Sequence, residues 1–63
     1  MCIGREVREL RHKHNMTATE LAELAGLSSG MLSKIENGHT SPSLATLQSL
    51  SIALNVSVTA LMR

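Results

Sequence analysis

The sequence contains no phenylalanine, tryptophan or tyrosine, so no aromatic ring can anchor its core. Packing must come instead from ten leucines, three isoleucines, three valines and four methionines. A chain of this length, 63 residues, buries only about 60% of the surface that its unfolded form exposes. We therefore expect residues 1–63 to form one small domain with modest stability of its own.

Cysteine and long apolar runs are also scarce. The single Cys2 cannot form a disulfide within the chain. The longest uninterrupted apolar run is two or three residues, whereas a membrane-spanning helix needs about twenty. With no secretory segment either, these absences predict a protein of the reducing cytoplasm that does not enter a membrane.

An excess of charge is missing as well. The net charge is +1, which is weak support for a nucleic-acid partner because a strongly basic domain is the usual signal. Basic side chains do gather in the first fourteen residues, diluted by Glu6 and Glu9: Arg5, Arg8, Arg11, His12, Lys13 and His14. On charge alone, this cluster is typical of an ordinary solvated helix face.

The residues that carry catalysis or metal binding do not occur in suitable patterns. His12 and His14 are two apart on an expected helix and do not share a face. No histidine pair has the spacing of four residues that would chelate a metal on a helix. The chain also lacks a nucleophile next to a base, a carboxylate pair and a glycine-rich phosphate loop after a strand. The sequence therefore predicts no enzyme activity, no metal and no cofactor.

Apolar spacing and capping residues instead predict an all-α protein with five helices. The first helix is expected over about 2–14, with Ile3, Val7 and Leu10 on its buried face. The second begins after Thr17, because "TATE" is a capping box that joins Thr17 and Glu20. Its expected apolar stripe is Leu21, Leu24 and Ala25, and it ends at Gly26, where a left-handed residue is favoured.

The third helix is expected between an N-cap at Ser28 and a stop at Gly38, with Leu32 and Ile35 inward and Met31 beside them. For a fourth helix, over about 42–54, Ser41 is the expected N-cap and Pro42 the first helical residue. The residues expected to be buried on it are Leu44, Leu47, Leu50, Ser51 and Leu54, before a stop at Asn55. Ser57 is expected to cap a short fifth helix with Leu61 inward.

Two residues of the fourth helix depart from a simple amphipathic pattern. Ser51 lies in the apolar stripe, where its hydroxyl can bond back to a helix carbonyl. Ile52 lies on the opposite side and is expected to be exposed. It is either an isolated apolar surface residue or a contact for another subunit or domain.

Residues 18–37 meet the requirements of a helix-turn-helix, two helices joined by a short turn that contains glycine. Ala22 is small enough for the helices to cross closely, and Gly26 is free to take a positive φ. Leu27 can fill the space under the turn. Each feature alone is common, but their occurrence together at fixed offsets favours this motif.

The outer side of the third helix carries small and polar side chains. On a helical wheel, Ser29, Gly30, Ser33, Lys34 and Asn37 share that side. Small side chains suit a helix that lies in a groove with its N-terminal residues against base edges. Lys34 can donate to guanine, and the serines can bond to almost any base.

The segment "TATELAELAGLSSGMLSKIENGHTSPSLATLQSLSIALNVSVTALM" resembles the Cro/repressor-type (XRE-family) helix-turn-helix domain. Within that family, "IGREVRELR", "LSSGMLSKIENG" and "SPSLATL" are most similar to the N-terminal domain of regulators with a C-terminal cupin sensor. The resemblance implies a five-helix bundle of the lambda-repressor-like type that reads a double-stranded DNA operator for a transcriptional regulator, such as a repressor, acting as a homodimer. A small-molecule effector would act only through a further C-terminal sensor domain.

The resemblance also implies roles for individual residues. The recognition helix would span about 29–37, with bases contacted by Ser29, Gly30, Ser33 and Lys34. The implied phosphate contacts are Thr17, Ser28, Asn37, His39, Thr40 and Ser41. Arg11 and Glu36 match an internal ion pair and are assigned to the scaffold, together with Ala22 and Gly26. Ala18 stands where several relatives have a phosphate-binding glutamine, so one contact is expected to be lost.

A second function stays open at this point. The same bundle can serve as a protein-interaction domain, as in an antitoxin that grips its toxin and binds its operator only secondarily. Such an interface prefers apolar and aromatic anchors. Ser29, Ser33 and Lys34 provide none, and this favours DNA binding.

Overall fold

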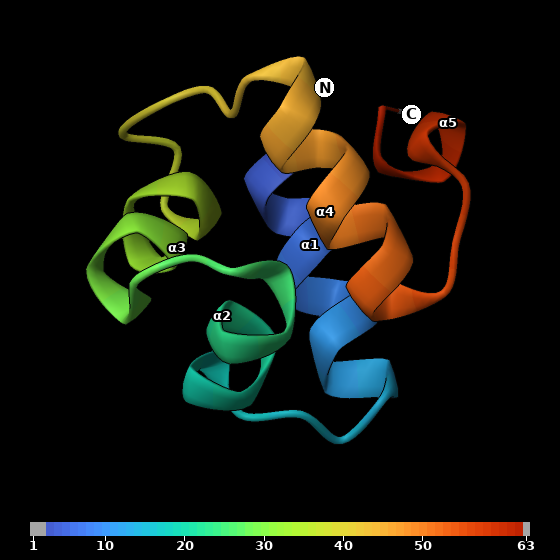
Figure 1. Cartoon of the computed structure of the whole chain (residues 1–63), viewed down its shortest axis with the longest axis horizontal. Coiled ribbons are helices and arrows are strands. Elements are labelled where there is room, and N and C mark those ends of the chain that lie inside the picture. Colours follow the sequence, from blue (N-terminus) through green and yellow to red (C-terminus); the bar gives the residue numbers. More distant parts are fainter. Residues whose placement is uncertain (1–2, 63) are drawn as a thin grey trace.

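The computed structural model describes residues 3–62 and shows five helices packed around one core (Figure 1). They are α1 (Ile3–Lys13), α2 (Ala18–Ala25), α3 (Ser29–Glu36), α4 (Leu44–Leu54) and α5 (Val58–Leu61). No strand occurs in this part of the chain. The predicted all-α, five-helix fold is confirmed, although the expected start of the first helix, at Cys2, lies outside the described residues.

Hydroxyl side chains start the helices where local sequence predicts them. Thr17 Oγ1 accepts from the Glu20 N–H at 3.1 Å, and Glu20 Oε1 accepts from the Thr17 N–H at 2.8 Å, which completes the predicted capping box. Ser28 Oγ accepts from the Met31 N–H at 3.1 Å. Ser57 caps α5, and Asn55 ends α4 with a φ of 56°. Each of these caps was predicted and is confirmed.

The start of α4 corrects the sequence-based expectation. Ser43, and not Ser41, is the N-cap, because its Oγ accepts from the Thr46 N–H at 3.2 Å. Pro42 therefore lies in the connection before the helix rather than at its first position. The long connection between α3 and α4 runs as an extended arch (Figure 1). A proline suits such a segment as well as it suits a first helical turn, so local sequence alone did not distinguish the two.

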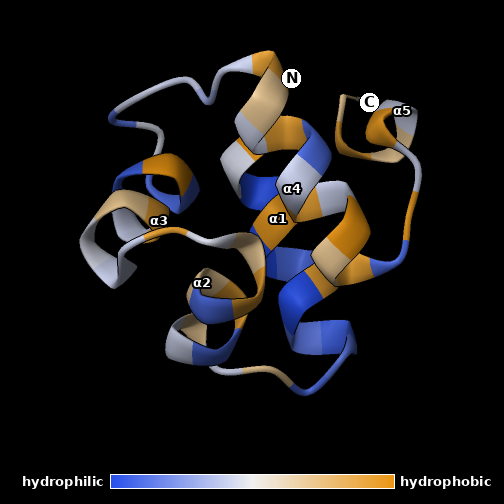
Figure 2. Cartoon of the chain, in the orientation of Figure 1, coloured by the Kyte–Doolittle hydropathy of each residue, from blue (hydrophilic) through white to orange (hydrophobic). Residues whose placement is uncertain are grey.

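The core is built from aliphatic side chains of all five helices, and α4 lies between α2 on one side and α5 on the other (Figure 1). Among residues 3–62, the largest fully buried side chains are those of Val7, Leu21, Leu32, Ile35, Leu50, Leu54 and Leu61. Apolar and polar residues alternate along α1, α2 and α4 (Figure 2), and the buried apolar residues of these helices belong to the core. The inward assignment of these seven residues is confirmed.

Two leucines assigned to the core are on the surface. Leu24 is 63% exposed, because α2 packs through Leu21, Ala22 and Ala25 and the adjoining position points away. Leu44 is 64% exposed, because it is the first residue of α4 and precedes by a turn the first buried residue of that helix, Leu47. Met31, expected beside the core, is also exposed.

The two unusual residues of α4 behave as predicted. Ser51 is buried, and its Oγ donates to the Gln48 carbonyl at 2.7 Å. Ile52 is 80% exposed. Within the described residues, no helix is both long enough and apolar enough to cross a membrane.

Gly4 determines how closely α1 approaches the end of α3, a role that the sequence did not reveal. A Cβ atom at this position would overlap the Ile35 carbonyl oxygen and lie 2.9 Å from the Glu36 carbonyl oxygen. Only glycine lets the first turn of α1 pack directly on the last turn of α3. This contact fixes α3 relative to the rest of the bundle.

Candidate nucleic-acid interface

The turn between α2 and α3 has the geometry that the helix-turn-helix motif requires. Gly26 adopts a left-handed conformation with a φ of 71°, and the Leu27 N–H donates to the Ala22 carbonyl at 2.8 Å. Ala22 is buried between the helices, and Leu27 packs half-buried against the core. The structural assignments of Ala22, Gly26 and Leu27 are confirmed.

The outer side of α3 is an exposed polar face, formed by Ser29, Gly30, Ser33 and Lys34. Its inner side is held by the buried Leu32 and Ile35. A Cβ built at Gly30 would have no neighbour within 4 Å, so the glycine is not needed for packing. The α3 face is thus slim by composition, and the assignment of its four residues to base contacts stays a prediction.

The residues assigned to phosphates lie at helix starts and in the connection after α3. Thr17 and Ser28 cap α2 and α3 and are exposed. Because each hydroxyl accepts the cap bond, its own proton is free to donate to an anion. His39, Thr40 and Ser41 are exposed in the connection to α4. These positions fit phosphate contacts at helix N-termini, and the contacts themselves stay predictions.

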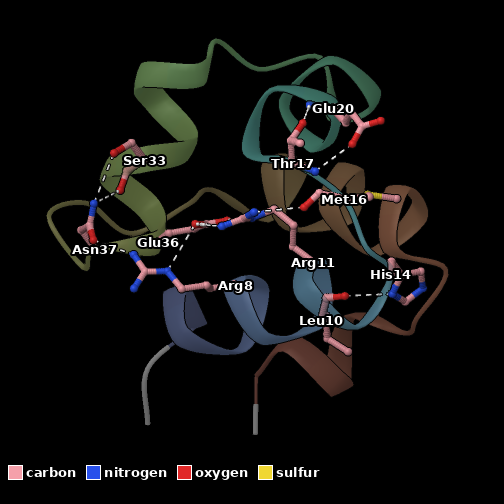
Figure 3. A network of polar contacts seen from close by, with 10 residues as sticks. All are labelled: Arg8, Leu10, Arg11, His14, Met16, Thr17, Glu20, Ser33, Glu36 and Asn37. Atoms are coloured by element: carbon pink, nitrogen blue, oxygen red, sulfur yellow. Dashed lines mark hydrogen bonds and ion pairs between the residues drawn. The ribbon is translucent and has the colours of Figure 1, made fainter.

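Arg11 and Glu36 form the predicted ion pair between α1 and α3 (Figure 3). Arg11 donates from Nε to Glu36 Oε2 at 2.8 Å and from Nη2 to Oε1 at 3.1 Å. Its Nη1 donates to the Met16 carbonyl at 3.1 Å, which ties in the connection before α2. The Glu36 side chain is only 5% exposed, so this bidentate pair is part of the scaffold.

Arg8 belongs to the same network, and sequence reasoning missed it. Its Nε lies 3.4 Å from Glu36 Oε1, and its Nη2 donates to Asn37 Oδ1 at 2.6 Å. Asn37 Nδ2 in turn donates to the carbonyl and the Oγ of Ser33, at 2.9 and 3.2 Å (Figure 3). The spacing of three between Arg8 and Arg11 places both on one face of α1 and was the available signal.

The histidines are not assembled into a metal site. Over residues 3–62, no group of three or more histidine, cysteine, aspartate or glutamate side chains could hold a metal ion. The ring of His14 instead bonds to the Leu10 carbonyl at 2.9 Å and closes the end of α1.

Comparisons with known proteins agree with this geometry. The helix-turn-helix family model matches residues 7–61. The immunity repressor protein of Bacillus phage phi105 is 36% identical over 61 residues, which are 97% of this chain and 42% of the repressor. The chain spans about half the length, or less, of the curated relatives that it matches.

Solved structures show the same fold. The biofilm regulator SinR in complex with DNA superimposes with a TM-score of 0.92 at 35% identity, covering 97% of this chain and 98% of that one. The DNA-binding domain of the P22 c2 repressor gives a TM-score of 0.95 at 29% identity, covering 98% and 82%. The narrower resemblance to regulators with a cupin sensor stays a prediction. The match over residues 7–61, together with the turn and the buried ion pair, shows that the chain belongs to the helix-turn-helix family of Cro- and repressor-type domains.

Proposed function

We propose that this chain is the DNA-reading domain of a transcriptional regulator and inserts α3 into the major groove of a double-stranded operator. The observation that carries the proposal is the exposed α3 face. Its outward side chains are small and polar, and the opposite side of the helix is held in the core by the buried Leu32 and Ile35. The SinR relative, solved in complex with DNA, supports it.

Binding in this proposal divides between two sets of groups. The exposed ends of α2 and α3 and the connection after α3 meet phosphates and set orientation. Helix N-termini carry partial positive charge and free N–H groups, so they bind phosphate without a large net charge. Lys34, with Ser29 and Ser33, then meets base edges. This division reconciles a net charge of +1 with DNA binding.

Two further assignments belong to the proposal. Base reading and phosphate binding require no enzyme activity and no cofactor, and the protein would act in the cytoplasm, where it meets duplex DNA. One domain covers only half an operator, so a working regulator would bind as a homodimer.

Lys34→Ala tests whether α3 reads bases. We expect it to cost about 1–3 kcal/mol on a preferred duplex selected from a random library, and clearly less on a scrambled duplex. Fluorescence anisotropy over about 50–200 mM salt gives both values, and wild-type affinity should fall steeply with salt. Equal losses on both duplexes would assign Lys34 to a phosphate. A wild-type affinity for duplex DNA that is absent or insensitive to salt would favour the antitoxin-like protein-interaction domain instead.

A further inference from the structure

We propose that the Arg8 guanidinium is a phosphate-binding group of this domain, supplied by α1 at the edge of the α3 face. The inference rests on the proposed function, because it needs α3 in the major groove. It adds a positive charge from outside the helix-turn-helix to contacts otherwise assigned to helix ends and to the connection after α3. Arg8 belongs to the basic cluster near the start of the chain, which on charge alone is typical of a solvated helix face.

Arg8 carries a positive charge that the scaffold does not need. Glu36 has one negative charge, and Arg11 already bonds to both of its oxygens, at 2.8 and 3.1 Å. The Arg8 Nε lies 3.4 Å from Glu36 Oε1, longer than the usual N–H···O distance of about 2.7–3.2 Å. Two guanidiniums thus face one carboxylate. The surplus charge lies on Arg8, whose side chain is 44% exposed, whereas that of Arg11 is 12% exposed.

The Arg8 guanidinium also has N–H groups to spare. Within residues 3–62, its Nε and Nη2 have acceptors, on Glu36 and Asn37, and its Nη1 has none. A guanidinium donates through all of its nitrogens and keeps its charge in proteins. Its planar fork matches the geometry of a phosphate group. The Nη1 hydrogens and the second hydrogen of Nη2 are therefore available to a phosphate while both internal contacts remain.

Contacts within the protein place this guanidinium beside the α3 face. Gly4 lets the first turn of α1 pack on the last turn of α3, and Arg8 follows on α1. Arg8 Nη2 donates to Asn37 Oδ1 at 2.6 Å, and Asn37 Nδ2 donates to the carbonyl and the Oγ of Ser33 (Figure 3). Ser33 belongs to the α3 face, so the charge lies next to that face, toward the C-terminal end of the helix.

The width of the major groove determines what such a group meets. The groove is about 12 Å wide, and a helix with its side chains is about 10–12 Å across, so an inserted α3 fills it. Groups on the helix then meet base edges, and groups beside it meet the phosphate backbone. Thr17 and Ser28 lie at helix starts, and Arg8 is a cation beside the other end of α3. Its two internal contacts already restrain it, which lowers the entropy lost on binding.

The experiment pairs one side chain with one phosphate in the full chain. The probe is a duplex selected from a random library, prepared as a series in which each phosphate in turn is replaced by an uncharged methylphosphonate. Affinities are measured for wild type, Arg8→Met and Arg8→Lys. Arg5→Met is the matched control, because it removes the same charge from the same helix, and Arg5 is 79% exposed and paired with Glu9.

Circular dichroism and urea unfolding confirm that each variant is folded. Arg8→Gln, which keeps an N–H donor for Asn37 without the charge, takes the place of Arg8→Met if the latter loses its helices.

We expect Arg8→Met to weaken binding about tenfold, as for one hydrogen bond to a charged group, and to a similar extent on selected and scrambled duplexes. Its salt slope should be lower by about 0.9. At one phosphate or two adjacent ones, the methylphosphonate should cost wild type and Arg5→Met about tenfold but Arg8→Met less than about twofold. Arg8→Lys should keep the salt slope and recover part of the affinity, because lysine retains the charge without the fork.

Two results would overturn the inference while leaving the proposed function intact. One is a folded Arg8→Met variant whose affinity and salt slope equal those of wild type. The other is a loss that Arg5→Met shares, or that stays the same on every methylphosphonate duplex, since either would show a general effect of charge and no contact with a phosphate. A wild-type protein that prefers no duplex would instead refute the proposed function itself.

Discussion

At the scale of single residues, the α3 face is notable for its small side chains. Ser29, Gly30 and Ser33 project almost nothing beyond the backbone, and Gly30 has free space where a Cβ would lie. Glycine within a helix costs about 1 kcal/mol against alanine, and no packing contact explains that cost here. The proposed insertion of α3 into a DNA groove would explain it, because small side chains suit a helix that lies against base edges.

Gly30 gives a prediction in which stability and binding change in opposite directions. Gly30→Ala should stabilise the fold by up to about 1 kcal/mol, because its Cβ meets no neighbour. Gly30→Glu should keep the helices and abolish DNA binding through bulk and negative charge. Urea unfolding followed by circular dichroism measures the first, and anisotropy with the selected duplex the second. Operator binding retained by Gly30→Glu would mean that α3 does not enter the groove.

At the scale of helices, most of the caps were predictable from the sequence, and the burial of individual side chains was less so. The capping box of Thr17 and Glu20 depends on residues three apart, so its bonds are decided within one turn. Leu24 and Leu44 were assigned to the core from apolar spacing and are exposed. Spacing shows which side of a helix is apolar, but the neighbouring helices decide how much of that side is covered.

The corrected start of α4 can be tested with two serines. Ser43→Ala should lower the free energy of unfolding by about 1 kcal/mol, since it removes the cap bond to the Thr46 N–H. Ser41→Ala should change it by less than about 0.5 kcal/mol, as expected for a surface substitution away from a cap. Chemical unfolding of both variants checks this. A larger cost for Ser41→Ala would place the cap where the sequence first suggested it.

At the scale of the whole molecule, the bundle fixes α3 through contacts from α1. Gly4 allows the two helices to touch, and Arg11 ties Glu36 to the end of α1 and the connection that follows. The candidate reading surface is therefore held rigidly although the domain measures only 23 × 23 × 19 Å. A domain of this size covers half an operator at most.

Dimeric binding predicts a dependence on half-site spacing. Duplexes with two selected half-sites about 34 Å apart, roughly one helical turn, should bind more tightly than duplexes offset by a further half turn. The offset turns the second half-site to the opposite side of the duplex. The two domains of a dimer then cannot bind the two half-sites at the same time. Affinity and stoichiometry across a spacing series measure this. Affinities that do not depend on spacing would show independent monomers.

Ile52 is a candidate contact for a second subunit. Its exposure was predicted and is confirmed, and whether it contacts another subunit stays a prediction. Further exposed apolar surface comes from Leu44 on the same helix, Leu24 on α2 and Met62 at the end of α5.

The sequence by itself determined the class of fold, the turn at Gly26, most of the caps and the pairing of Arg11 with Glu36, which the family resemblance supplied. Caps and turns are local, since they join residues within a few positions of one another. The tertiary structure alone decided the close approach at Gly4, the true start of α4 and the chain of bonds from Arg8 through Asn37 to Ser33. The contacts of Gly4 with Ile35 and of Arg8 with Asn37 join residues about thirty positions apart in the chain, so they exist only once α1 packs against α3. The start of α4 joins Ser43 to Thr46, and the sequence offers two serines, Ser41 and Ser43, that could begin this helix.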